Sequence, residues 1–167
     1  MKSRQLFVVC SLLVTPVLVT GLVQGGDKKK PKNDVCATGG SQNICSSDRT
    51  CGSPSTPCRV DIRRSESGGS ASATPDFAGG KSNEAFCVKA GTTIIFASKS
   101  KNTGFVLDFG NSSPFDGQTA IMGGADRPVS VVAKKPGCYT YSVGACTAGG
   151  IYGMCGEDTA QFVVSAN

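Results

Sequence analysis

The sequence predicts an all-β protein built as an antiparallel sandwich of two sheets. Glycine makes up 22 of the 167 residues, well above its usual share of roughly 7%, and charged residues make up only 17%. Short apolar segments, several of them alternating with polar residues, recur between turn residues, and no segment has the periodicity of an amphipathic helix. The length suits about one domain, and six or more short strands pack most simply as two sheets.

The first 25 residues have the composition of a signal peptide. Lys2 and Arg4 precede an apolar run from Leu6 to Val19, and small residues up to Gly25 suit cleavage. The alternative is a retained membrane anchor, but the lysines that follow disfavour it because positive charge normally stays on the cytoplasmic flank. We therefore expect residues 1–25 to be removed, the mature protein to be secreted or periplasmic, and no membrane-spanning helix to remain.

Cleavage also removes Cys10 and leaves eight of the nine cysteines. An even number in an exported chain predicts four disulfides. Metal binding by thiolates is the alternative, but the chain has no histidine and no C-x-x-C pair to support it. The eight cysteines are Cys36, Cys45, Cys51, Cys58, Cys87, Cys138, Cys146 and Cys155.

Residues 26–57 are expected to form a basic and cysteine-rich N-terminal arm, and residues 58–167 the sandwich. The segment 36–58 has no periodicity and is too short for a core of its own, so we expect it to lie over one end of the sandwich, held by disulfides. Nearer the N-terminus, four lysines are either a solvated leader or an electrostatic contact for an acidic surface. They are Lys28, Lys29, Lys30 and Lys32.

The first half of the sandwich contains three predicted strands. Val60 and Ile62 alternate with charged residues, which is typical of a half-buried strand. Residues 65–83 are rich in Gly, Ser and Ala and predict a long surface loop. A strand over 86–88, a turn over 89–91 and a strand over 92–97 follow.

The second half contains four more. Phe105, Leu107 and Phe109 alternate with Val106 and Asp108, so they should face the core while Val106 and Asp108 face outward. Strands are then expected over 129–132, over 138–141 after the turn at 134–137, and over 159–164 at the end of the chain. Tyr139 and Tyr141 either form an aromatic contact surface or lie in the core with their hydroxyls at its rim.

The last half of the chain resembles the cupredoxin family. The matching segments are Val88 to Phe96 (VKAGTTIIF), Gly104 to Phe109, Lys135 to Tyr141 (KPGCYTY), and Gly153 to Gly156 followed by Gln161 to Val164. The resemblance implies a Greek-key sandwich. It also implies a copper-binding histidine after the first strand pair, and cysteine, histidine and methionine ligands in the loop that follows the tyrosine strand.

The positions that the resemblance assigns to copper ligands lack them. The first histidine falls near Thr103 or Gly104 and the cysteine falls at Val143, so only Met154 remains. Blue copper needs two imidazoles and a thiolate, and methionine is only the weak axial ligand. We therefore expect no metal and no other cofactor.

The same resemblance implies two disulfide pairings. Cys146 and Cys155 bracket the former ligand loop and are expected to close it. The alternative, a cuprous site made of these two cysteines and Met154, uses soft ligands but needs reduced thiols. Cys87 and Cys138 fall at the opposite end and are expected to pair, leaving the other four cysteines to pair among themselves.

The composition excludes most catalytic sites. Without histidine there is no Ser-His-Asp triad and no histidine base. Residues 98–101 match S-x-x-K, but they follow a strand and lack the companion motifs of the enzymes that use it. The carboxylates are scattered among turns, where surface or turn-capping roles are expected; they are Asp108, Asp116, Asp126, Glu157 and Asp158. Asn111 begins an N-glycosylation sequon.

From the sequence we predict an exported, non-enzymatic accessory or structural binding module on a copper-free cupredoxin-like scaffold. Its partner is expected to be another extracytoplasmic protein or an acidic surface. Nucleic acid is not expected, because no aromatic residues interleave with a basic stripe. Two alternatives remain open: an electron-transfer or copper-carrying protein with unconventional Cys and Met ligands, and a secreted disulfide-rich inhibitor or toxin.

Overall fold

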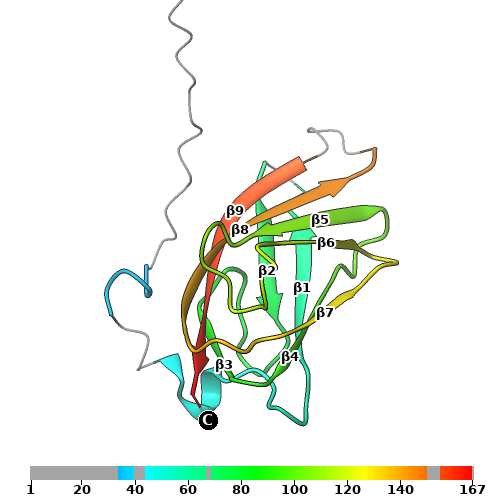
Figure 1. Cartoon of the computed structure of the whole chain (residues 1–167). Coiled ribbons are helices and arrows are strands. Elements are labelled where there is room, and N and C mark those ends of the chain that lie inside the picture. The colour runs from blue at the N-terminus through cyan, green and yellow to red at the C-terminus, as the bar shows by residue number, and fades with distance from the viewer. Residues whose placement is uncertain (1–33, 40–43, 67–68, 150–154, 167) are drawn as a thin grey trace, which may run out of the picture.

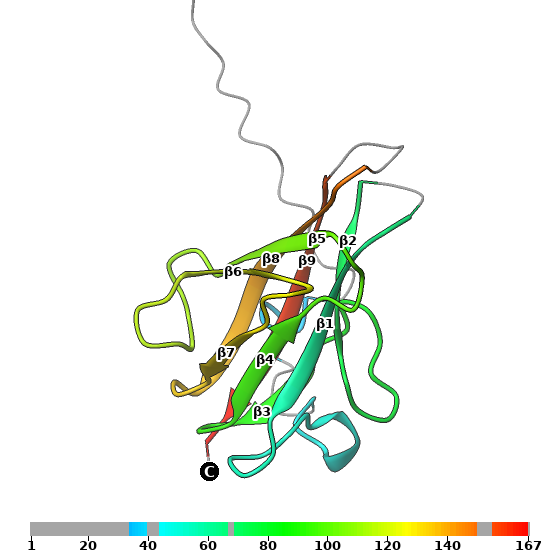
Figure 2. The same cartoon turned by 90° about the vertical axis from the view of Figure 1, so that its right-hand side faces the viewer.

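The described residues form nine strands in two sheets that face each other. The computed structural model describes residues 34–39, 44–66, 69–149 and 155–166, so the expected signal peptide and the four lysines of the arm lie outside the described residues. Figures 1 and 2 show the two layers from two sides. The predicted all-β architecture of two sheets is confirmed.

One sheet has four strands and the other has five. The four-stranded sheet has the order β2-β1-β4-β7, with β2 at Ala71–Pro75, β1 at Cys58–Arg64, β4 at Thr93–Ala97 and β7 at Val129–Val132. The five-stranded sheet has the order β3-β9-β8-β5-β6, with β3 at Phe86–Lys89, β9 at Cys155–Ser165, β8 at Gly137–Thr147, β5 at Thr103–Asp108 and β6 at Ala120–Gly124.

Both sheets are mixed, so the prediction of purely antiparallel sheets is wrong. β1 pairs with β4 in parallel, and β3 pairs with β9 in parallel. β2 is antiparallel to β1, whereas β4 is parallel to β1, and a tight turn from Lys89 to Thr92 lies immediately before β4.

The predicted loop over 65–83 contains β2, which the sequence did not reveal. Ala71 and Ala73 face the core, but such small side chains carry almost no strand signal. Pairing with β1 and the amide side chain of Asn83 hold the strand. Asn83 accepts a hydrogen bond from the Ala73 N–H at 2.7 Å and donates one to the Ala71 carbonyl at 3.1 Å. β6 was missed for the same reason, since it contains two glycines.

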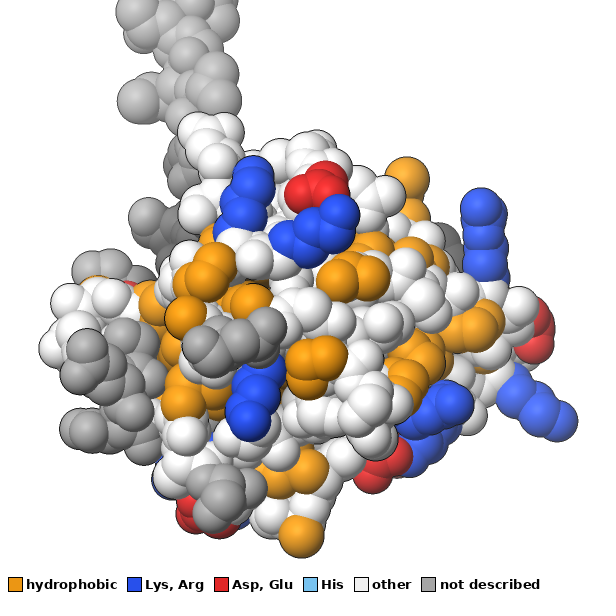
Figure 3. Space-filling view, turned by 60° about the horizontal axis from the view of Figure 1, so that its bottom comes forward, with side chains coloured by type: hydrophobic (Ala, Val, Ile, Leu, Met, Phe, Trp, Pro, Cys, Tyr) orange, Lys and Arg blue, Asp and Glu red, His pale blue; other side chains and the backbone are white. Residues whose placement is uncertain are grey.

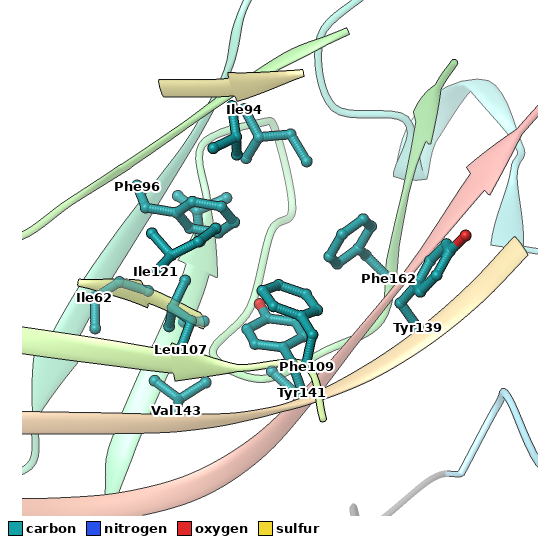
Figure 4. Packing of buried hydrophobic residues seen from close by; sticks show 14 of the residues in the cluster. Ile62, Ile94, Phe96, Leu107, Phe109, Ile121, Tyr139, Tyr141, Val143 and Phe162 are labelled. Carbon is teal, nitrogen blue, oxygen red and sulfur yellow. The ribbon is translucent and has the colours of Figure 1, made fainter. Parts of the chain in front are cut away.

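Aromatic rings fill the core between the sheets (Figure 4). Phe109 and Tyr141 stack with ring centroids 4.9 Å apart, and Phe115 meets Phe109 edge to face at 5.2 Å. The predicted alternation on β5 is confirmed, because Phe105 and Leu107 are buried while Val106 is 41% exposed on the outer face. The core therefore lies between the inner faces of the two sheets. The outer faces are left for solvent or for contacts with other segments.

The N-terminal arm covers part of the outer face of the five-stranded sheet. Val35 and Ile44 pack there with Val163 of β9. Gln161 of β9 also points outward but is buried under the arm. Its Nε2 donates to Asp34 Oδ1 at 2.7 Å and to Thr140 Oγ1 at 2.8 Å, and its Oε1 accepts from the Val35 N–H at 3.0 Å. The arm thus contributes its own small hydrophobic cluster and a satisfied buried amide.

All eight cysteines of the described residues are paired. The bridges are Cys36–Cys138, Cys45–Cys87, Cys51–Cys58 and Cys146–Cys155. The predicted closure of the β8–β9 loop by Cys146 and Cys155 is confirmed.

The predicted bridge between Cys87 and Cys138 is wrong. Both residues align with Val163, Cys87 from β3 and Cys138 from β8, so strand β9 lies between them. Two strand spacings separate the backbones by about 10 Å, beyond the reach of a disulfide, which ends at about 7 Å between Cα atoms. Each cysteine instead pairs with one from the arm, and these two bridges fasten the arm to the sheet.

Candidate functional site

Thr103 and Gly104, where the cupredoxin resemblance expects the first copper ligand, lie at one end of the sandwich. We call it the β8–β9 end; it consists of the turns over 98–102 and 124–128 and the adjoining ends of β8 and β9. Thr103 pairs with Thr147, and Gly104 pairs with Cys146. The hydroxyls of Thr103 and Thr147 are 2.9 Å apart and share a hydrogen bond. The structure therefore brings the first expected ligand position next to the end of β8.

Val143, the expected position of the cysteine ligand, belongs to the core. It is fully buried in the middle of β8, between Leu107 of β5 and Asp158 of β9. β8 continues to Thr147, so the expected ligand loop is still strand at residues 144–147. An aliphatic side chain that packs against Leu107 stabilises the sheet and offers a metal no lone pair.

The remaining soft ligands are engaged or lie outside the described residues. Cys146 and Cys155 face each other as the last aligned pair of β8 and β9, and their sulfurs are bonded. A metal needs the thiolate form, which a disulfide does not supply. Met154 lies outside the described residues. Within the described part of the chain, no three His, Cys, Asp or Glu residues gather in a way that could hold a metal ion.

A shallow hollow of about 340 Å³ lies beside these positions. Its lining comes from three consecutive residues at the start of β5, Asn102 to Gly104, and from Met122 to Arg127 of β6 and the following turn. Asp126 and Arg127 are exposed there, and the neighbouring Lys99 and Lys101 are exposed as well. Among the described residues, these charged groups form no ion pair. The hollow can offer charge and hydrogen bonds to a ligand.

The loop over 109–119, another candidate recognition surface, lies at the opposite end of the sandwich. Phe115 anchors it in the core, and the Pro114 carbonyl accepts hydrogen bonds from the N–H groups of Lys134 at 3.0 Å and Lys135 at 3.3 Å. Asp116 pairs with Lys134, and the hydrogen bond from that ammonium group lowers the pKa of the Asp116 carboxyl. Asn111 is exposed. The structure therefore places this loop away from the β8–β9 end.

The opposite end of the molecule also carries the disulfide-linked arm, and Figure 3 views this end. Hydrophobic side chains form several separate patches on it, and Lys and Arg side chains are spread among them rather than gathered. Among the described side chains in this view, the charged groups therefore form no single patch.

Most of the other polar residues considered in the sequence have local structural partners. Asp108 Oδ1 accepts from the Gly110 N–H at 2.8 Å, and Asp158 Oδ1 accepts from the Thr159 N–H at 2.8 Å. Ser98 of the S-x-x-K segment accepts from the Ser100 N–H at 3.2 Å, so it caps a turn. The contacts of Asp108 and Ser98 are those expected of turn-capping groups, but the expected turn position of Glu157 and Asp158 is wrong, because both lie within strand β9.

The two tyrosines of β8 belong to the core and form no contact surface. The Tyr139 hydroxyl donates to the Lys135 carbonyl at 2.8 Å. This agrees with the second of the two interpretations, a tyrosine in the core with its hydroxyl at the rim. The Tyr141 hydroxyl is buried instead and has no hydrogen-bond partner among the described residues. Burial raises the pKa of both phenols.

One surface was not predicted as a site. Val106 and Met122 align across β5 and β6 on the outer face and are 41% and 72% exposed. Gly104 and Gly144 adjoin them, and we call these four residues the open face. The arm does not reach this part of the sheet in the described residues. The alternation of apolar and polar residues over 105–109 predicted that Val106 faces outward. Met122 lies on β6, a strand that the sequence did not predict.

No protein-family model matches the chain, and no curated protein or solved structure is significantly similar to it. In the described residues, no helix has the length and apolar character that crossing a membrane requires. The case for a function therefore depends on the geometry of the β8–β9 end and on the sequence.

Proposed function

We propose that this protein is an exported, non-enzymatic binding module on a cupredoxin-like Greek-key sandwich that holds no copper. The proposal depends mainly on which residues occupy the β8–β9 end. Of the copper ligands that the resemblance implies, only Met154 remains; threonine or glycine and a buried valine occupy other positions, and a disulfide closes the loop. An end of the sandwich without metal ligands is available for recognising a partner.

The arrangement of strands supports the cupredoxin-like part of the proposal. The resemblance implies that the strand with Tyr139 and Tyr141 runs into the ligand loop and that the final strand follows it. β8 and β9 have this order and are neighbours in the sheet. β5, which begins with the other expected ligand position, pairs with β8 on its other side.

The disulfides support a location outside the cytoplasm. Four bridges among eight cysteines are typical of an oxidising compartment, and the sequence begins with the parts of a signal peptide. The arm bridges also suit a stable exported module, because they close long segments of chain and restrict the unfolded state most.

The partner we propose is another extracytoplasmic protein. The hollow at the β8–β9 end is shallow, and unpaired charged groups surround it among the described residues. A shallow, charged surface suits a polypeptide better than a buried small molecule, because small ligands are normally enclosed on most of their surface. The four lysines of the arm would add attraction to an acidic partner.

Copper titration tests the metal-free part. The oxidised protein should bind neither Cu(II) nor Cu(I) stoichiometrically and should show no intense visible charge-transfer band. A tight one-to-one site with that band would overturn the proposal and favour the copper-carrying alternative.

Site-directed cross-linking tests the binding part. A photo-crosslinking residue at Met122, in the hollow, should give a discrete adduct in the native source. Excess unlabelled protein should suppress that adduct, and excess Arg127→Ala protein should suppress it less. The same probe at Val132, an exposed position on β7 of the other sheet, is the matched control. Equal adducts at both positions would refute a binding site at the β8–β9 end.

A further inference from the structure

The four disulfides differ in their exposure to solvent. Cys51 and Cys58 are both buried, and Cys87 is buried against the arm with Cys45. Cys36 and Cys138 are half-buried at the edge of the same cluster. Cys146 and Cys155 are both exposed, and theirs is the one bridge in the described residues of which this is true. An external thiolate must reach a sulfur to attack it, so exposure sets which bridge can react in the folded protein.

Among the described residues, nothing obstructs the approach to the exposed bridge on one side. Its two cysteines continue a row that runs across β6, β5, β8 and β9 on the outer face: Gly124, Gly104, Cys146 and Cys155. The two glycines carry no side chain, and even an added methyl at Gly104 would meet nothing closer than the Gly123 carbonyl oxygen at 3.8 Å. A polypeptide can therefore lie flat over this row and bring a thiol to Cys146.

The next row of the sheet supplies an apolar contact beside the bridge. It contains Met122, Val106 and Gly144, with side chains on the same face as Cys146. Met122 and Val106 are among the most exposed large apolar residues of the described part of the chain. Exposed apolar side chains that adjoin a reactive group, rather than scattered singly, mark a surface for a partner.

The charge beside the bridge makes its cysteines poor nucleophiles once they are reduced. Glu157 lies two residues from Cys155 on the same face of β9 and is exposed. A carboxylate beside a thiol disfavours the thiolate, whereas catalytic cysteines lie in electropositive surroundings. A disulfide has no thiolate of its own and the other described cysteines are paired, so the attacking thiolate must come from another molecule.

We propose that the Cys146–Cys155 disulfide is a thiol–disulfide exchange site that is reduced by a dithiol redox protein seated on the open face. This goes beyond the binding role proposed above and does not depend on it. The partner is identified by its chemistry: two neighbouring thiols, one of them a thiolate, on a surface with an apolar patch to meet Val106 and Met122.

The exchange takes place in two balanced steps. A partner thiolate attacks one sulfur of the bridge, the bond between Cys146 and Cys155 breaks, and the released thiolate takes up a proton. The second thiol of the partner loses its proton and attacks its own sulfur in the mixed disulfide, releasing the second cysteine as a thiolate that is then protonated. The partner loses two electrons and becomes a disulfide, and the bridge gains them and becomes two thiols.

Reduction of this bridge changes the β8–β9 end and spares the remaining fold. The two strands stay aligned from Gly137 with Val164 to Ala145 with Gly156, and the other three bridges are retained. What is lost is the covalent closure of the chain between residues 146 and 155. The exchange therefore switches the covalent state of the proposed binding end.

The first experiment measures which bridge is reduced. The oxidised protein is incubated with increasing dithiothreitol, thiols are blocked with iodoacetamide, and peptides are mapped by mass spectrometry. Label should appear at Cys146 and Cys155 at about tenfold less reductant than at any other cysteine. The double variant Cys146→Ser with Cys155→Ser should take up no label in that range. Another bridge reacting first, or all four reacting together, would overturn the proposal.

The second experiment measures docking, with a thioredoxin-type dithiol protein as the probe. Met122→Glu should slow reduction by this protein at least about fivefold, as loss of an interface anchor does, and should leave reduction by dithiothreitol unchanged. Val132→Glu, at an exposed apolar position on the other sheet, is the control and should change neither rate. If Met122→Glu leaves the protein-dependent rate unchanged, or slows both reductants equally, the open face is not the docking surface.

Discussion

The two tyrosines of β8 give a sharp prediction, because the same substitution should have opposite effects at neighbouring inward positions. Tyr139 and Tyr141 both lie in the aromatic core, but the Tyr139 hydroxyl donates to the Lys135 carbonyl at 2.8 Å. The Tyr141 hydroxyl is buried without a partner among the described residues. We expect Tyr141→Phe to stabilise the protein and Tyr139→Phe to destabilise it.

The magnitudes follow from the two environments. Removal of a buried hydroxyl that makes no hydrogen bond recovers its desolvation cost, and we expect a gain of about 1 kcal/mol after the loss of its packing contacts. Phenylalanine retains the stacking with Phe109 at 4.9 Å between ring centroids. At Tyr139, the loss of one hydrogen bond costs about 1 kcal/mol. The two variants should therefore differ by about 2 kcal/mol, or by roughly 6–10 °C in Tm for a domain of this size.

Thermal and urea denaturation of the oxidised proteins measures both differences, with wild type as the reference. A Tyr141→Phe protein that loses as much stability as Tyr139→Phe would refute the reasoning, since it would mean that the Tyr141 hydroxyl has a partner that stabilises it.

The same burial predicts a dependence on pH. Burial raises the pKa of the Tyr141 phenol above its ordinary value of 10.0. As pH rises past about 10, the unfolded state loses the phenolic proton first, so stability that is complete below pH 10 declines above it. Tyr141→Phe should make this decline less steep. A decline with the wild-type slope in this variant would contradict the assignment to Tyr141.

Three further predictions concern packing, the arm and its charge. Gly156→Ala should lower the free energy of unfolding by about 1–3 kcal/mol, because the added methyl would lie 2.3 Å from the Ser70 carbonyl oxygen; Gly104→Ala is the control, with 3.8 Å to its nearest neighbour and no expected change in Tm. Gln161→Leu should remove the hydrogen bonds to Asp34 and Val35, cost about 2 kcal/mol and speed proteolytic cleavage within residues 34–39; unchanged cleavage would mean that the disulfides alone hold the arm. Replacement of Lys28, Lys29, Lys30 and Lys32 by Gln should abolish salt-sensitive attachment to an acidic partner or surface and leave Tm unchanged. If the variant still co-sediments with that partner or surface, and with the salt dependence of the wild type, the lysines are not the contact.

Local patterns predicted the strands whose side chains carry a strong signal. Alternation in β5 and the apolar residues of β1, β3, β4 and β7 were enough, because those residues must be buried on one face whatever their neighbours are. β8 and β9 were also predicted, but each extends toward residues 146 and 155 beyond the predicted range. β2 and β6 were missed, since alanine and glycine become strand through pairing with a neighbour.

The candidate site, like the strands, could be predicted from the sequence only in part. The sequence by itself determined that the chain has no imidazole for a copper site and that its eight cysteines after residue 25 form an even set. The resemblance to the cupredoxin family also implied that Cys146 and Cys155 are partners, because they bracket the loop that holds the copper ligands in that family.

Only the tertiary structure decided how the other cysteines pair and what surrounds the exposed bridge. Cys87 and Cys138 were expected to meet, and β9 separates them, so that each binds a cysteine of the arm. Met122 adjoins Val106 and the row of Cys146 only because β6 pairs with β5 and β5 pairs with β8. Which strand lies between two others is set by contacts among segments far apart in the chain, and periodicity within one segment carries no information about them.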